Sequence, residues 1–111
     1  MNDVEKQTIY EVVSVLKELL KDNLVKIILY GSHARGDNNP FSDIDIFVLV
    51  RNPKSELNKI LNIISDKIFE LDLKYNVTIN PLIENVKVFN QYKESYLLFE
   101  NIEQDGIVLY D

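Results

Sequence analysis

Two short apolar runs, separated by a polar segment, constrain the fold of this chain more than any other feature. The runs cover Val25–Tyr30 and Ile44–Val50. Runs of this length, bounded by turn-forming residues, are typical of β-strands. The first run is apolar enough to be covered on both faces, which predicts a strand inside a sheet that other elements cover.

The polar segment between the runs contains a glycine–serine corner followed by two aspartates. Side chains alternate along a strand, so Asp43 and Asp45 are expected on the same face. Two carboxylates about 4 Å apart repel by roughly 4 kcal/mol at an effective dielectric constant near 20. We therefore expect a hard divalent cation, which prefers oxygen ligands, to offset the repulsion. Gly31 allows a tight turn, and a helix that opens at Ser32 would offer its N–H groups to phosphate. Together these parts indicate phosphoryl or nucleotidyl transfer.

Each part also has a purely structural interpretation. The corner can be an ordinary tight turn, and Ser42 with Asp43 can cap a helix or a turn. Arg35 can contact a phosphate in bidentate fashion or pair with a local carboxylate, and the sequence does not separate the two. His33 is expected to be an exposed residue of the turn, without a catalytic role.

The spacing of Gly31-Ser32, ten residues and then Asp43-x-Asp45 resembles the motif of the nucleotidyltransferase superfamily of DNA polymerase beta. More narrowly, residues 31–37 and 42–45 look like the minimal nucleotidyltransferases of prokaryotes. The resemblance implies a polymerase-beta-like α/β (α+β) fold, with a small mixed sheet covered by helices. It implies that Asp43 and Asp45 are the catalytic residues and hold Mg²⁺, and that Gly31, Ser32 and Arg35 bind the nucleotide.

The chain departs from this pattern in one respect. The superfamily commonly supplies a third carboxylate from the third strand, as metal ligand and general base. Here Thr78 and Asn80 lie where that carboxylate is expected, and neither can act as a base near neutral pH. Asp72 and Glu84 flank the strand and are expected to lie too far along the chain. Either no base is needed, or it comes from elsewhere, or the site binds nucleotide with little turnover.

Small proteins of this family typically pair, as antitoxins, with a helical toxin that carries a HEPN domain. The resemblance therefore implies transfer of AMP from ATP to a hydroxyl group of a partner toxin, with a tyrosine as a possible acceptor. The alternative is a non-catalytic antitoxin that binds nucleotide and only masks its partner. A third alternative is a drug-modifying nucleotidyltransferase, but such relatives usually need a second domain to enclose their substrate, and a single domain is expected for 111 residues. The net charge of −6 favours a basic protein over long nucleic acid as the partner.

The rest of the chain predicts helices around these strands. Apolar residues spaced three and four positions apart predict the first helix. Acidic residues at its start and lysines near its end suit the helix dipole. Pro81 suggests an edge strand or an early end for the third strand. The predicted elements are a helix over Asp3–Asp22 closed by Asn23, a short turn Ser32–Arg35 ended by Gly36, a loop over 37–42, a helix capped by Ser55, a strand Val77–Ile83, a helix Glu94–Glu103 with Leu97, Leu98 and Ile102 inward, and a strand Ile107–Tyr110.

Length and composition set outer limits. A chain of 111 residues is expected to form one nucleotidyltransferase domain, residues 1–111, with a modest core. The absence of cysteine excludes disulfides, thiol catalysis and zinc–thiolate sites. The longest strongly apolar run, Ile46–Val50, is far too short to span a membrane, and the N-terminus lacks a secretory pattern. A cytoplasmic protein without membrane contact is therefore expected.

Overall fold

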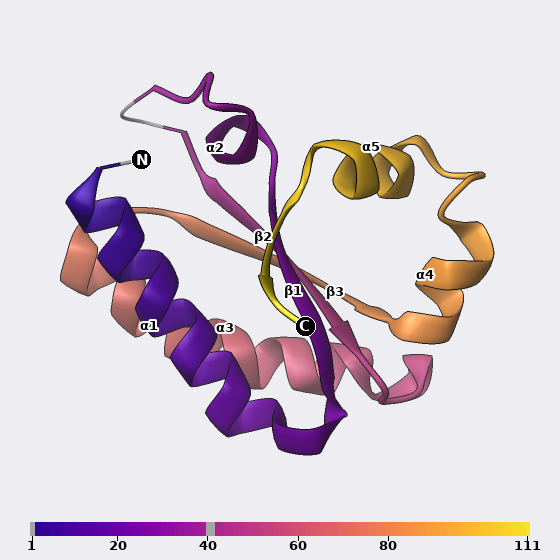
Figure 1. Cartoon of the computed structure of the whole chain (residues 1–111). Coiled ribbons are helices and arrows are strands. Elements are labelled where there is room, and N and C mark those ends of the chain that lie inside the picture. Colours follow the sequence, from indigo (N-terminus) through magenta and orange to yellow (C-terminus); the bar gives the residue numbers. More distant parts are fainter. Residues whose placement is uncertain (1, 40–41) are drawn as a thin grey trace.

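The computed structural model describes residues 2–39 and 42–111. In these residues a four-stranded sheet has the order β3-β2-β1-β4 (Figure 1). Its strands are β1 (Leu24–Tyr30), β2 (Ile44–Val50), β3 (Ile79–Asn85) and β4 (Ile107–Tyr110). β2 and β3 are parallel, whereas β1 is antiparallel to both β2 and β4. The sheet is therefore mixed, and the two predicted apolar strands lie at its centre.

Helices cover both faces of the sheet, but unequally (Figure 1). Two long helices, α1 (Asp3–Leu20) and α3 (Leu57–Tyr75), pack on one face, and each is followed or preceded by a 3₁₀ turn, at Lys21–Asn23 and Lys54–Glu56. Two shorter helices, α4 (Val86–Tyr92) and α5 (Leu97–Asp105), pack on the other face. The short helix α2 (Ser32–Arg35) follows β1 directly. This arrangement confirms the predicted mixed α/β fold.

Alternation along the central strands divides the core in two. Ile27 and Leu29 pack with the apolar sides of α1 and α3, whereas Ile28 points to the opposite cluster. That second cluster is mainly aromatic, and the ring centroids of Phe47, Phe89 and Phe99 lie 5.2–5.8 Å apart. The first strand is thus covered on both faces, as its sequence predicted.

Several element boundaries differ from those predicted. The α1 helix ends at Leu20, because Lys21 adopts a positive φ of 47° while its N–H still bonds to the carbonyl of Lys17. Ser55 lies inside a 3₁₀ turn, and α3 begins at Leu57 with no side-chain cap hydrogen bond. The predicted Ser55 cap is therefore wrong.

The third strand begins two residues later than predicted, at Ile79. The chain is still leaving α3 at this point, since Asn76 has a left-handed conformation and the N–H of Val77 bonds to the carbonyl of Asp72. Pro81 lies within β3, which is an edge strand, as the proline suggested. The predicted loop 37–42 includes residues 40 and 41, which lie outside the described residues.

The last helix begins at Leu97, and its inward residues are Phe99 and Ile102. Leu97 and Leu98 are 71% and 46% exposed, so the prediction that they point inward is wrong. Residues 97–99 are all apolar, and their pattern alone does not set the phase of the helix. The phase is decided by Phe99, whose ring reaches both Phe47 and Phe89.

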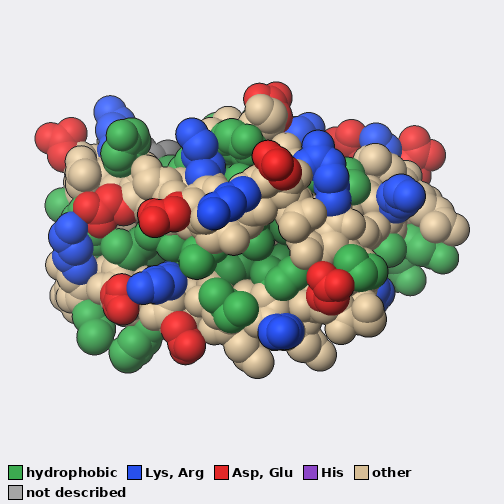
Figure 2. All heavy atoms as spheres, turned by 90° about the horizontal axis from the view of Figure 1, so that it is seen from below, with side chains coloured by type: hydrophobic (Ala, Val, Ile, Leu, Met, Phe, Trp, Pro, Cys, Tyr) green, Lys and Arg blue, Asp and Glu red, His purple; other side chains and the backbone are tan. Residues whose placement is uncertain are grey.

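The outer surface of the layer formed by α1 and α3 carries charges of both signs, with apolar side chains between them (Figure 2). One ion pair, between Lys74 Nζ and Glu11 Oε1 at 2.8 Å, joins α3 to α1. In the part of the chain that the structure describes, no helix is long and apolar enough to cross a membrane.

Candidate active site

The two predicted aspartates lie at the beginning of β2, an inner strand of the sheet. Asp45 belongs to the strand, where its neighbours in register are Tyr30 of β1 and Asn80 of β3. Asp43 directly precedes the strand and is exposed, whereas Asp45 is half-buried. Residues opposite each other on neighbouring strands bring their side chains within contact distance. Tyr30 and Asn80 are therefore the immediate surroundings of Asp45.

The glycine–serine corner lies directly against Asp45. Gly31 follows β1 with a positive φ of 75°, and a Cβ atom placed on it would lie 2.4 Å from Oδ2 of Asp45. A Cβ atom there would force the carboxylate of Asp45 to shift, and the positive φ is itself strained for other residues, so glycine lets the backbone approach the carboxylate this closely. Ser32 then opens α2, and Gly36 closes it in a left-handed conformation with its N–H bonded to the carbonyl of Ser32. The structure thus brings the corner and Asp45 together.

The third strand supplies an amide at the position opposite Asp45. Asn80 Nδ2 donates a hydrogen bond to Asp45 Oδ1 at 3.2 Å. Asn80, rather than Thr78, is therefore the residue in contact with the aspartate, and it cannot take up a proton at neutral pH. Among the described residues, no group of three or more histidine, aspartate or glutamate side chains is arranged to hold a metal ion.

The two carboxylates that flank the third strand have other partners. Asp72 accepts a hydrogen bond from the N–H of Ile79 at 2.9 Å. Burial raises the pKa of Asp72, the bond from Ile79 lowers it, and the charge of Asp43 raises it further. Asp72 is thus distant from Asp43 in sequence, but the negative charge of Asp43 contributes to the raised pKa of Asp72. Glu84 pairs with Lys54 Nζ at 3.3 Å and lies opposite Leu49, four residues along β2 from Asp45.

His33 is not the exposed residue that the sequence predicted. Its side chain is buried, with the residue 8% exposed. Its Nδ1 atom lies 3.2 Å from Oε2 of Glu5, and its Nε2 atom lies 3.2 Å from the carbonyl oxygen of Ser42. The sequence could not reveal this, because Glu5 is 28 positions away and belongs to a different helix. The prediction was wrong because Glu5, near the start of α1, lies beside His33.

Arg35 pairs with a local carboxylate, one of its two predicted contacts. Its Nε atom lies 3.1 Å from Oδ2 of Asp37, and both side chains are about half exposed. Such an exposed pair contributes little to stability, so it does not hold the guanidinium strongly. A contact between Arg35 and phosphate stays a prediction.

Tyr30 is a neighbour of Asp45 that the sequence analysis missed. Burial raises the pKa of its hydroxyl group, and the charge of Asp45 raises it further. The hydroxyl therefore keeps its proton at neutral pH. Antiparallel pairing of the two apolar runs was the available signal, since it places the last residue of the first run near the start of the second.

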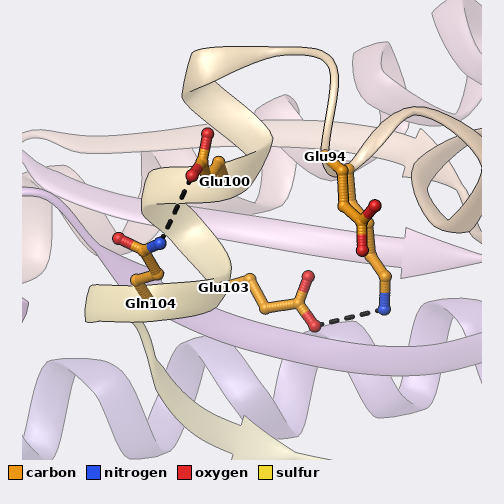
Figure 3. Close-up of a pocket in the computed structure, with 5 residues that line it drawn as sticks. Glu94, Glu100, Glu103 and Gln104 are labelled. Atoms are coloured by element: carbon orange, nitrogen blue, oxygen red, sulfur yellow. Dashed lines mark hydrogen bonds and ion pairs between the residues drawn. The ribbon is translucent and has the colours of Figure 1, made fainter.

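A separate hollow on the α4–α5 side of the molecule has a different character. It encloses about 400 Å³ and is lined by Lys93, Glu94, Glu100, Glu103 and Gln104. Figure 3 shows these side chains, with Gln104 bonded to Glu100 and Glu103 paired with Lys93. The glutamates are exposed, as solvated surface charges usually are. None of the predicted site residues lines this hollow.

A mixed sheet with a glycine–serine turn against an aspartate of the neighbouring strand is the arrangement of a nucleotidyltransferase. The nucleotidyltransferase domain family matches residues 9–109. The chain therefore belongs to this family and is a nucleotidyltransferase enzyme.

Two relatives from Methanocaldococcus jannaschii are provisionally named protein adenylyltransferases. MJ0604 is 36% identical over 106 residues, covering 96% of this chain and 98% of its own length. MJ0141 is 38% identical over 82 residues, covering 66% of this chain and 79% of its own length.

Solved structures show the same fold at low sequence identity. Spectinomycin adenyltransferase AAD(9) from Enterococcus faecialis, solved with ATP and spectinomycin, has a TM-score of 0.73 at 19% identity, covering 95% of this chain and 55% of that chain. A minimal nucleotidyltransferase has a TM-score of 0.60 at 17% identity, covering 96% of this chain and 95% of that chain. Both support the polymerase-beta-like architecture.

Proposed function

We propose that this chain is a cytoplasmic, Mg²⁺-dependent enzyme that transfers AMP from ATP to a hydroxyl group of a protein. In this proposal the protein is a HEPN-domain toxin, the acceptor group is a tyrosine, and the chain acts as the antitoxin. The observation that carries the transferase proposal is the close approach of Gly31 to Asp45, where a Cβ atom would lie 2.4 Å from the carboxylate. A glycine backbone without a side chain beside a carboxylate suits a site that binds a phosphate group and a metal ion next to each other.

The donor atoms at the site fit Mg²⁺. Asp43 and Asp45 offer carboxylate oxygens, which are the ligands that this ion prefers, and the nearby imidazole of His33 faces Glu5 and Ser42 instead. Mg²⁺, when bound, neutralises the triphosphate charge and polarises the phosphorus under attack. Asp43 and Asp45 would hold it, and Asn80 would orient Asp45 through the hydrogen bond that it donates.

The other residues of the site would bind and orient the nucleotide. The Ser32 hydroxyl and the neighbouring N–H groups would hold the β- and γ-phosphates, and Arg35 would exchange Asp37 for a phosphate oxygen. The acceptor oxygen then attacks the α-phosphorus, and the bond from this phosphorus to the bridging oxygen breaks to release pyrophosphate. The acceptor proton leaves to water or to an aspartate of the site, because the amide of Asn80 cannot accept it.

The comparisons support the identity of the substrates. The names of MJ0604 and MJ0141 indicate a protein as acceptor, and the spectinomycin enzyme was solved with ATP. The position of Asn80 favours a second candidate, a non-catalytic antitoxin that binds nucleotide and only masks its partner. An amide opposite Asp45 leaves the site without the usual third carboxylate.

Co-expression with the product of the neighbouring gene tests both candidates. We expect that product to be a small, basic, mostly helical protein. Mass spectrometry should show one AMP group added to a tyrosine of this protein. The Asp43→Asn/Asp45→Asn variant should still bind this protein but leave it unmodified. A partner that is neutralised without added nucleotide on either chain would favour the masking antitoxin.

A further inference from the structure

We infer that His33 is a positioning residue that ties the segment carrying Asp43 to the turn carrying Ser32. The inference rests on the proposed function, because it concerns how the proposed metal and phosphate sites are held relative to each other. Its basis is a single buried imidazole with contacts to two other parts of the chain.

His33 directly follows Ser32 in α2, and its Nε2 atom lies 3.2 Å from the carbonyl oxygen of Ser42. Ser42 directly precedes Asp43. On the other side of Asp43, the N–H of Ile44 donates to the carbonyl of Thr78 at 2.8 Å. The exposed Asp43 therefore lies between two residues whose backbone groups are held by contacts, and one of these contacts comes from the side chain of the residue next to Ser32.

The imidazole is itself held from its other side. Its Nδ1 atom lies 3.2 Å from Oε2 of Glu5, whose side chain is 15% exposed. The second oxygen of Glu5 accepts a hydrogen bond from Asn2 at 2.9 Å, and Asn2 in turn caps α1 by accepting from the N–H of Glu5 at 2.8 Å. A chain of contacts thus runs from the start of α1 through His33 to the start of β2.

The contacts of the two ring nitrogens hold different parts of the chain. Both partners, the carboxylate of Glu5 and the carbonyl of Ser42, are hydrogen-bond acceptors, so each contact needs an N–H group from the ring. The Nδ1 contact fixes the ring to α1, whereas the Nε2 contact fixes the backbone beside Asp43. Only loss of the Nε2 contact should release the segment that carries the aspartate.

Two substitutions separate these contacts. His33→Gln places an amide N–H₂ near the position of Nε2, and His33→Asn places one near Nδ1, because the two side chains differ in length by one methylene group. Gln is therefore expected to retain the bond to Ser42, and Asn the bond to Glu5. Both remove the ring, so each serves as the control for the other in packing and in melting temperature.

The first readout is amide hydrogen exchange at Ser42 in the protein without nucleotide. Its N–H bonds to the carbonyl of Asn39 at 3.1 Å, so its exchange reports on the order of this segment. We expect His33→Asn to exchange roughly fivefold to tenfold faster than wild type, as for the loss of one hydrogen bond. His33→Gln should stay close to wild type. Equal exchange in the two variants would overturn the inference.

The second readout is the gain in ATP affinity that Mg²⁺ produces, measured by calorimetry. We expect this gain to fall by a similar factor in His33→Asn and to be kept in His33→Gln. If both variants keep the full gain, His33 has only a structural role and the positioning inference is wrong. If wild type shows no gain, the proposed function fails and the positioning role with it, while the exchange measurement still decides whether His33 fastens the segment.

Discussion

The two faces of the sheet differ in how completely they are covered. On one face, α1 and α3 bury an aliphatic layer that runs the length of the strands, and Ile46, Val48 and Val50 are fully buried there. On the other face, aromatic rings cover only part of the sheet. Phe47 lies beneath Phe89 and Phe99, whereas Asp45, two residues earlier, stays half-exposed.

This difference separates, within a single strand, the residues that build the core from those of the proposed site. Successive residues of β2 alternate between the two faces, so one seven-residue strand supplies both the centre of the core and the proposed metal ligand. Along β2, Phe47 is the first residue that side chains of α4 and α5 cover on this face. These helices leave the start of β2 accessible next to Gly31 and Ser32, where the proposed nucleotide site lies.

The strongest test of this separation removes both carboxylates. Asp43→Asn with Asp45→Asn should lower transfer by at least about a hundredfold, the scale of losing groups that stabilise a transition state. It should also abolish the Mg²⁺-dependent part of ATP binding. The melting temperature without metal should not fall, because the change removes two like charges. Equal Mg²⁺-dependent binding by variant and wild type in calorimetry would refute the site assignment.

A change on the covered face should have the opposite profile. Ile46→Ala removes a fully buried side chain and should cost about 2–5 kcal/mol of unfolding free energy, measured by urea denaturation. The affinity of the remaining folded protein for Mg²⁺–ATP should be unchanged. Ile107→Ala, at a residue 42% exposed, is the control and should cost much less. Comparable losses at the two positions would contradict the assignment of Ile46 to the buried core.

The two glycines that bound α2 allow a matched comparison. Both have positive φ, so Gly31→Ala and Gly36→Ala each carry a backbone strain of about 1–3 kcal/mol, with the larger strain at Gly31, whose ψ of −155° lies in a region that is essentially restricted to glycine. Only at Gly31 would the added Cβ also meet Asp45, since nothing lies within 4 Å of a Cβ at Gly36. Gly31→Ala should therefore lose transfer and Mg²⁺–ATP binding, whereas Gly36→Ala should lose stability alone. Similar activity of the two variants would show that the close approach is unimportant.

Restoring a carboxylate on β3 should have a smaller, favourable effect on metal binding. Asn80→Asp places a third carboxylate in contact with Asp45, and we expect Mg²⁺ affinity to rise several-fold while the metal-free protein becomes less stable through like-charge repulsion. Titration calorimetry and thermal melts measure the two effects. Thr78→Asp is the comparison, and an equal or larger gain there would mean that Asn80 is not the residue facing the site.

The smallest effect concerns Asp72. Because its pKa is raised in the folded protein, the group favours folding below its unfolded pKa of about 3.9, and this contribution is lost as pH rises through the folded pKa. Asp72→Asn keeps an acceptor for Ile79 without the charge. It should stabilise the metal-free protein at pH 7 by less than about 1 kcal/mol, and the difference should vanish in acid. Urea denaturation at both pH values measures it, and a destabilised variant at pH 7 would show that the charge of Asp72 is needed.

Much of the site was accessible from the sequence because its parts are local. Gly31, Ser32 and Asp43 through Val50 lie within one stretch of the chain, and glycine conformation, strand alternation and carboxylate chemistry act over a few residues. The α2 turn and β2 have the predicted bounds for the same reason. The amide at Asn80 was also expected, although its contact with Asp45 depended on a register that the sequence does not set.

Tertiary structure alone decided the contacts between distant segments. The burial of His33 follows from Glu5 on α1, the neighbourhood of Tyr30 and Asp45 from the pairing of β1 with β2, and the phase of α5 from Phe99 against Phe47. Periodicity shows which side of an element is apolar, but not which residue of another element it will meet. That choice depends on how helices and strands pack in three dimensions, where residues far apart in the chain compete for the same space.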